Sequence, residues 1–205
     1  MNFLNSKAEV EKNEKLLAKP KREEAEEAVR TLLRWAGDDP LREGLIDTPS
    51  RVVRAYTEWF SGYNQDPEKI LQRTFEEVAG YSEIVTLKDI RFESYCEHHL
   101  APIIGVVHVA YIPAERVVGI SKIARLVDAF SKRLQVQEKM TSQIANTLQT
   151  VLKPLGTAVL VEGEHHCMCT RGVHKTTSTM VSSAFTGNFQ KNQDLKNDFF
   201  KIVGK

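Results

Sequence analysis

The sequence predicts an α+β fold in which helices come first and strands are grouped later in the chain. Apolar residues recur at helical spacing between Glu23 and about residue 62. After about residue 82 the pattern changes to strand-like alternation, and the segments then follow the order strand, strand, helix, helix, strand, strand. Strands and helices segregated in this way favour α+β over a parallel sheet with helical crossovers.

The composition is that of a globular protein and excludes several classes. The chain has 205 residues, 41% hydrophobic and 27% charged, and its net charge is +1. This charge gives no overall basic field, so we expect neither nucleic acid nor membrane as a partner. The N-terminus lacks the apolar run of a secretory signal, and no apolar stretch is long enough to span a bilayer, so we expect a cytoplasmic location.

The N-terminal part is predicted to be a charged arm followed by helices. Residues 1–21 are rich in Lys, Glu and Asn and form the expected arm, and residues 22–82 form the expected helical segment. Its first helix starts at Glu23 and stops at the GDDP sequence, residues 37–40. For the second helix, Thr48 is the expected N-cap and Gly62 the expected C′ residue.

Residues 83–205 are predicted to form one α+β domain, which also holds the residues that could carry chemistry. We expect strands over about 84–94 and 101–112, helices over 121–134 and 137–152, strands near 157–164 and 176–186, and a short helix over 190–202.

Cysteine and histidine are concentrated in two short windows, CEHH (Cys96–His99) and HHCMC (His165–Cys169). Thiolates and imidazoles are the ligands that zinc prefers. Cys96 and His99 can reach one metal from a turn, and either Cys167 or Cys169 can complete the set. Three protein ligands would leave a fourth position for water, as in catalytic zinc sites. Two alternatives are less favoured. One is a closed structural site that uses both Cys167 and Cys169, and the other is a pair of reduced core cysteines beside surface histidines.

Two further groups carry charge suited to a nucleotide. Ser121, Lys122 and Arg125 open a helix, where backbone N–H groups favour an anion, and Arg171 follows the second Cys/His window and suits bidentate phosphate binding. Glu138 stands at the start of the next helix, where it either complements the helix dipole or accepts hydrogen bonds from a guanine edge. We interpret two of the remaining histidines as non-catalytic: His108 as a structural core residue and His174 as a loop residue.

Several stretches resemble the GTP cyclohydrolase I family. They are REGLIDTPSRVVRAYTEWFSGY, SYCEHHLAPIIGVVHVAYIP, GISKIARLVDAF, QVQEKMTSQIA and HHCMCTRGVHKTTSTMVSSAF. The likeness runs from about Glu23 to the end of the chain and is most specific over 91–187. Cys169 and His166 are not demanded by the family's motif. A thiol at 169 keeps the choice of third ligand open, and His166 is interpreted as structural.

The resemblance implies a reaction and roles for residues. The family converts GTP and water to formate and 7,8-dihydroneopterin triphosphate, the first step toward folate and other pterins. By resemblance, Cys96, His99 and Cys167 would bind Zn²⁺, and His98 and His165 would be catalytic. Glu138 would recognise guanine, and the triphosphate would be bound by Ser121, Lys122, Arg125, Arg171 and Arg51.

The resemblance also implies a tunnelling fold, an antiparallel ββααββ unit with helices on one side, and a toroidal homodecamer with active sites between subunits. Glu138 and the zinc then need not come from one chain. Two alternatives stay open at this point. One is a related tunnelling-fold enzyme, such as a nitrile-reducing deazaguanine enzyme or a pyruvoyl-pterin synthase, although the Cys/His/Cys set disfavours both. The other is a GTP-binding protein, or an assembly protein held together by zinc, that has lost catalysis.

Overall fold

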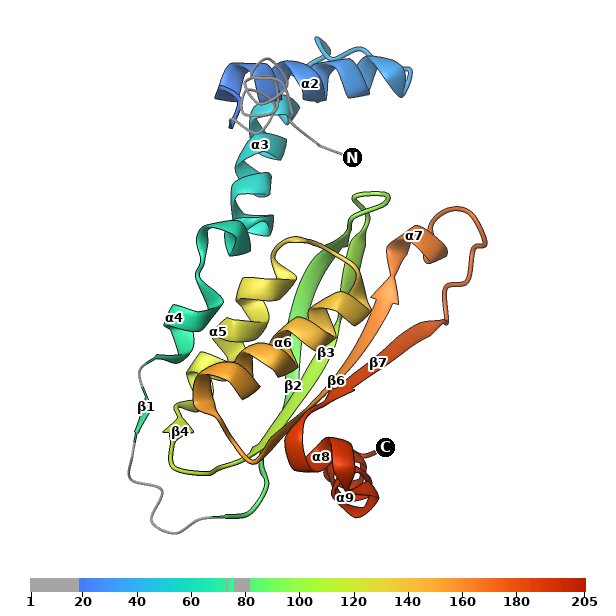
Figure 1. The fold of residues 1–205 in the computed structure, drawn as a ribbon. Helices are drawn as coiled ribbons and strands as arrows, with labels where there is room; N and C mark the ends of the chain where they lie inside the picture. The colour runs from blue at the N-terminus through green and yellow to red at the C-terminus, as the bar shows by residue number, and fades with distance from the viewer. Residues whose placement is uncertain (1–18, 73, 76–81) are drawn as a thin grey trace, which may run out of the picture. The chain divides into compact units, whose positions relative to one another are not determined.

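A computed structural model describes residues 19–72, 74–75 and 82–205, and the chain divides into two compact units between Thr57 and Glu58. The first unit contains helix α2 (Arg22–Trp35) and most of α3 (Thr48–Trp59) (Figure 1). Helix α2 ends as predicted before GDDP, where Gly37 adopts φ +92°. The predicted arm lies outside the described residues except for 19–21, and the predicted domain boundaries remain predictions.

The end of α3 differs from the expectation. Thr48, expected just before the helix, is its first residue, and Gly62 lies in a 3₁₀ helix, η1 (Ser61–Asn64), rather than at a helix C′ position. Close packing explains this glycine, because a Cβ there would lie 2.6 Å from the Ala129 carbonyl oxygen. The Gly62 N–H also donates to the Lys132 carbonyl.

The predicted helical segment also contains a strand. After η1 comes α4 (Pro67–Leu71), whose N-terminus is capped by the Asp66 carboxylate. Strand β1 (Thr74–Phe75) then pairs with β4 (Val117–Val118). Two-residue strands are too short to show a period in the sequence, which is why neither was predicted.

The second unit is built on a five-stranded mixed sheet with the order β5-β2-β3-β6-β7. The strands are β2 (Val85–Cys96), β3 (Pro102–Ile112), β5 (Leu134–Gln135), β6 (Gly156–His165) and β7 (Thr179–Phe185). Neighbouring strands are antiparallel except β2 and β5, which are parallel. The secondary structure is therefore α+β, as predicted.

Helices cover both faces of this sheet. Helices α5 (Ile120–Ser131) and α6 (Gln137–Leu152) lie on one face (Figure 1) and enclose the main core with residues such as Val107 and Val161. No helix among the described residues is long and apolar enough to cross a membrane.

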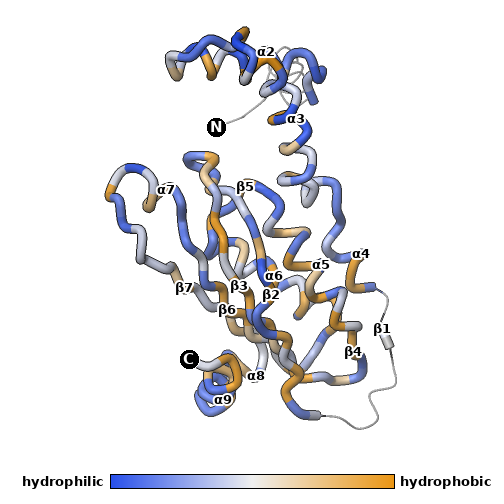
Figure 2. The backbone as a smooth tube through the Cα atoms, turned by 180° about the vertical axis from the view of Figure 1, so that it is seen from behind, coloured by the Kyte–Doolittle hydropathy of each residue, from blue (hydrophilic) through white to orange (hydrophobic). Residues whose placement is uncertain are grey.

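The expectation of helices on one side only is wrong at the C-terminus. The predicted helix over 190–202 is two helices, α8 (Gly187–Lys191) and α9 (Gln193–Val203). They are separated at Asn192, whose side chain caps α9. Phe189 and Phe199 are fully buried against Ala110, Ala158 and Leu160, which alternate with the residues of the main core. Figure 2 shows the apolar residues gathered on the central strands, with α9 beside their lower ends.

The sheet register brings the two Cys/His windows together. Strand β2 ends at Cys96, and the turn over 97–101 is closed by the Cys96 N–H, which donates to the Ala101 carbonyl at 2.8 Å. In the β3–β6 ladder, Ile103 is the register partner of His165. The end of β6 and the short helix α7 (His166–Cys169) therefore lie next to that turn.

Candidate metal centre and active site

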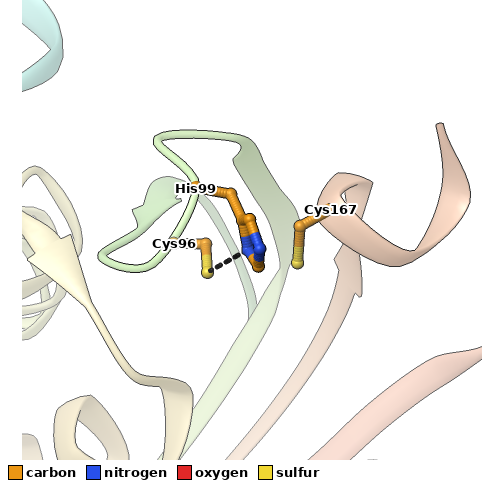
Figure 3. Close-up of side chains that lie close together, drawn as sticks. All are labelled: Cys96, His99 and Cys167. Atoms are coloured by element: carbon orange, nitrogen blue, oxygen red, sulfur yellow. Dashed lines mark hydrogen bonds between the residues drawn. The ribbon is translucent and has the colours of Figure 1, made fainter. Parts of the chain in front are cut away.

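Cys96, His99 and Cys167 form a group that could hold a metal ion. One ligand atom from each lies within 4.8 Å of the other two. Figure 3 shows the His99 ring between the two thiols, with Cys96 on one side of it and Cys167 on the other. The Cys96 thiol is buried, the Cys167 side chain is half-buried and His99 is exposed, so the group is open to solvent on one side.

The donor chemistry fits zinc. Two sulfur atoms and an imidazole nitrogen are a set that zinc binds with one position left open. Burial raises the pKa of the Cys167 thiol, and the neighbouring Cys96 raises it further. Two thiols this close do not both ionise easily, and a divalent cation between them would favour both thiolates. The arrangement is therefore compatible with a bound Zn²⁺.

Cys169 lies outside this group. Residues two apart in a helix point about 200° away from each other, and the Cys169 thiol is buried on the other side of α7. It lies 3.6 Å from a Glu164 carboxylate oxygen and 3.5 Å from the Lys175 carbonyl. Burial, and then Glu164, raise the pKa of Cys169. Of the two thiols left open by the sequence, the geometry selects Cys167.

The two histidines expected to be catalytic lie at this group. His98 Nδ1 is 3.8 Å from the Cys96 sulfur, and the His98 side chain is 66% exposed. His165 is half-buried, and its Nε2 lies 2.9 Å from Gln137 Oε1. Burial lowers the pKa of His165, and the Glu138 charge partly opposes this. The neutral imidazole is thereby favoured, which leaves one ring nitrogen able to accept a proton. His166 faces Glu164 instead, at 4.0 Å.

Glu138 and Arg171 lie near these residues within the same chain. Glu138 is exposed at the start of α6, and its charge acts on His165. An Arg171 guanidinium nitrogen lies 3.1 Å from His99 Nε2. This places a guanidinium beside the metal group, as the sequence suggested, and brings the Glu138 charge close enough to act on the His165 ring.

The predicted anion ligands on α5 lie away from the metal group. Ser121, Lys122 and Arg125 are on the N-terminal half of α5, whereas the C-terminal end of α5 leads to β5 (Figure 2), in which Gln135 is the register partner of Cys96. Lys122 donates to the Ile70 carbonyl at 2.8 Å, so its ammonium helps to hold α4. Arg51 belongs to the first unit, where it pairs with Asp47 at 3.2 Å.

The structure also shows what the other polar residues do. His108 is buried, accepts a hydrogen bond from the Asp89 N–H and contacts Glu162 at 3.3 Å, so its interpretation as a structural residue is confirmed. His174 lies in the loop after α7, as expected. The residue that sequence reasoning missed is Gln137, which is buried against His165. The one sequence feature that could have indicated Gln137 is that a polar residue lies three positions before Met140, on the inward-facing side of the helix.

Comparison with known proteins identifies the family. A profile of the GTP cyclohydrolase I family matches residues 25–204. A GTP cyclohydrolase 1 from Maricaulis maris (strain MCS10) is 60% identical over 185 residues, which is 90% of each chain. The relative of that name from Hyphomonas neptunium is 58% identical over 91% of each chain, and the one from Brucella canis is 55% identical over 90% of this chain and 87% of its own.

A solved apo structure of an archaeosine synthase, QueF-Like, covers 51% of this chain and 94% of its own at 22% identity and a TM-score of 0.42, too weak a likeness to bear on fold or function. The family profile and the relatives decide against the other tunnelling-fold enzymes considered above. The chain belongs to the GTP cyclohydrolase I family of enzymes.

Proposed function

We propose that this enzyme opens the imidazole ring of GTP with the help of zinc, releases formate, and rearranges the product to 7,8-dihydroneopterin triphosphate. The observation that carries the proposal is the group Cys96, His99 and Cys167 beside His165. When bound there, Zn²⁺ supplies Lewis-acid activation of water at neutral pH.

The residues around the metal group suit the other requirements of the reaction. His165 is placed to exchange a proton with N7 of the base, and the exposed His98 to move protons between the site and solvent. Glu138 can accept two hydrogen bonds from the N1–H and amino edge of guanine. Arg171 can donate to a phosphate oxygen once its contact with His99 is exchanged for one with the substrate.

We further propose that the site is completed by a neighbouring subunit. Ser121, Lys122 and Arg125 are suited to a triphosphate, but Ser121 lies ten residues from the end of α5 that leads to the metal group, or about 15 Å along the helix. A neighbouring copy would bring its own α5 to the site, as in the tunnelling fold and toroidal decamer that the resemblance implies. Arg51 would join the triphosphate set in such an assembly. The proposed setting is cytoplasmic, at the entry to folate or another pterin pathway.

Formate release from GTP tests the proposal directly. The reduced, zinc-loaded protein should release formate and give a fluorescent pterin after oxidation, and chelation should abolish both until zinc is restored. His98→Ala should retain zinc and lose turnover, which separates catalysis from a structural metal role. Absence of formate from a zinc-loaded, assembled protein would refute the proposal, and unchanged turnover in His98→Ala would refute the role of that residue.

A further inference from the structure

The side chain of Gln137 is held in one orientation inside the protein. Gln137 is the first residue of α6 and only 1% exposed. Its amide nitrogen lies 3.2 Å from the Val161 carbonyl, 3.0 Å from the Met180 carbonyl and 3.0 Å from the Ser182 hydroxyl. Two of these partners are carbonyls, which can only accept. The amide therefore cannot be turned around without placing its oxygen against two carbonyl oxygens.

This orientation fixes which atom faces His165. The Gln137 oxygen, Oε1, lies 2.9 Å from His165 Nε2, and an amide oxygen can only accept a hydrogen bond. His165 must therefore donate, so its Nε2 carries the proton. In the neutral ring the lone pair is then on Nδ1. Among the described residues, no hydrogen bond to His165 Nδ1 is formed, so this nitrogen is left for a ligand.

Small and polar neighbours keep the glutamine in place. A Cβ at Gly163 would lie 2.5 Å from Gln137 Oε1, so the absence of a side chain there makes room for the amide. Thr141 Oγ1 lies 2.7 Å from the Gln137 carbonyl and 2.7 Å from the Ser182 hydroxyl. Ser182 thus links the backbone and the side chain of Gln137 through one network. A buried network in which each member has a partner is rigid.

We propose that Gln137 is a positioning residue for catalysis: it holds the His165 ring in place as the Nε2–H tautomer, so that Nδ1 is the ring nitrogen that takes up a proton and passes it to the substrate. This inference rests on the proposed role of His165. Nδ1 of the neutral ring carries a lone pair, so it first accepts a proton from solvent and then passes that proton to the ring nitrogen of the base, while Nε2 keeps its own proton on Gln137. The carbonyl partners Val161 and Met180 belong to β6 and β7, so the sheet itself sets the direction of the catalytic ring.

Substitution of Gln137 by methionine removes the acceptor and keeps the length of the side chain. Gln137→Met should lower kcat about 10- to 100-fold, the range for partners that orient a ligand or catalytic ring, with KM changed less than about threefold and the zinc content unchanged. Gln149→Met is the matched control. Gln149 is on the same helix and also uses both ends of its amide, with Pro154 and Thr186, away from the metal group. It should keep kcat within about twofold.

A double-mutant cycle separates positioning from a merely structural role. If Gln137 acts through His165, then Gln137→Met combined with His165→Ala should be no slower than His165→Ala alone, within about twofold. Losses that multiply in the double variant, or full kcat in Gln137→Met, would overturn the inference. Full activity of His165→Ala would instead refute the proposed role of His165, so the two failures are distinguishable.

Two further measurements keep the inference testable if Gln137→Met does not fold. Gly163→Ala should displace Oε1 and give the same kcat loss while Gln137 is still present. Nitrogen NMR of the unaltered protein with labelled histidine, assigned by comparison with His165→Ala, should show His165 protonated at Nε2. A ring protonated at Nδ1 alone would overturn the inference without any activity measurement.

Discussion

Mixing two inactive variants should restore activity if each active site is shared between subunits. The two variants are His165→Ala, which removes a group at the metal end, and Arg125→Ala, which removes an exposed cation from α5. Arg125 lies six residues from the C-terminal end of α5, or about 9 Å along the helix. On its own, each variant lacks one half of every site. In a mixed assembly, the metal half of one chain can meet the α5 half of the other.

The expected recovery follows from counting. Each shared site needs an intact His165 from one chain and an intact Arg125 from its neighbour. In a random one-to-one mixture, each of these residues is intact in half of the chains, so about a quarter of the sites are complete. Co-expression of differently tagged chains, followed by a formate assay per site, measures this fraction. The matched control mixes unaltered chains with chains carrying both changes. It should give about a quarter of full activity for shared sites and about a half for sites within one chain.

The refuting result is equally clear. If the two single variants give no recovery although the tags show mixed assemblies, and the control gives about a half, the site lies within one chain. The separation of Ser121 and Arg125 from the metal group would then have to be spanned by the substrate itself. The proposal of a neighbour's α5 would be abandoned, whereas the metal group and His165 would be unaffected.

Three other predictions concern the metal and stability. Cys167→Ala should reduce bound zinc from about one ion per chain to a small fraction, whereas Cys169→Ala should retain it, as measured by elemental analysis; equal zinc loss in both would contradict the assignment. Phe199→Ala should lower the free energy of unfolding by about 3–5 kcal/mol, because the ring is fully buried against Phe185 and Phe189. As a control in the same denaturant titration, Lys201→Ala at an exposed position should change the free energy of unfolding by no more than about 0.5 kcal/mol. Burial raises the pKa of the Asp128 carboxyl; Lys132 opposes this rise and Glu93 adds to it. The folded state therefore disfavours the charged carboxylate. As a result, the protein loses stability as the pH rises through the raised pKa. Asp128→Asn should therefore raise Tm at neutral pH, with the gain vanishing at pH values below 3.8, where the carboxyl is protonated in both states; a lower Tm at neutral pH would show that Lys132 dominates.

The parts of the site that lie close in sequence could be predicted, and those that depend on distant packing could not. Cys96 and His99 share a turn, so their place in one candidate metal group could be predicted from spacing. Cys167 joins the group because β6 ends beside that turn. The choice between Cys167 and Cys169 needed the structure. Only the direction of α7 shows that the second thiol faces Glu164.

Lys122 and Gln137 show why sequence alone could not assign some roles: Lys122 was given a role that its contact does not support, and Gln137 was given none. Lys122 was assigned to phosphate because it opens a helix, yet its ammonium donates to Ile70, which is 52 residues earlier in the chain. Gln137 attracted no assignment because nothing near it in the sequence marks its partners, which lie on β6 and β7. In both cases the decisive contact joins elements that meet only through tertiary packing.

The fold shows the same division. The long strands and the helices α5 and α6 carry clear periods and were predicted to within a few residues. The break at Asn192 was missed because the apolar spacing of the tail runs through it, while the local capping by Asn192 ends one helix and begins the next.

Two facing glycines connect the sheet register to the catalytic geometry. Gly105 and Gly163 are register partners in the β3–β6 ladder, and a Cβ at Gly105 would lie within 2 Å of the Glu162 carbonyl oxygen. The strands can therefore approach this closely only where residue 105 has no side chain. A slip of one residue would turn His165 to the opposite face of the sheet, away from Gln137 and the metal group. The close approach that Gly105 permits, and the space for the amide that Gly163 provides, thus act together to keep His165 on the side of the sheet where Gln137 and the metal group lie.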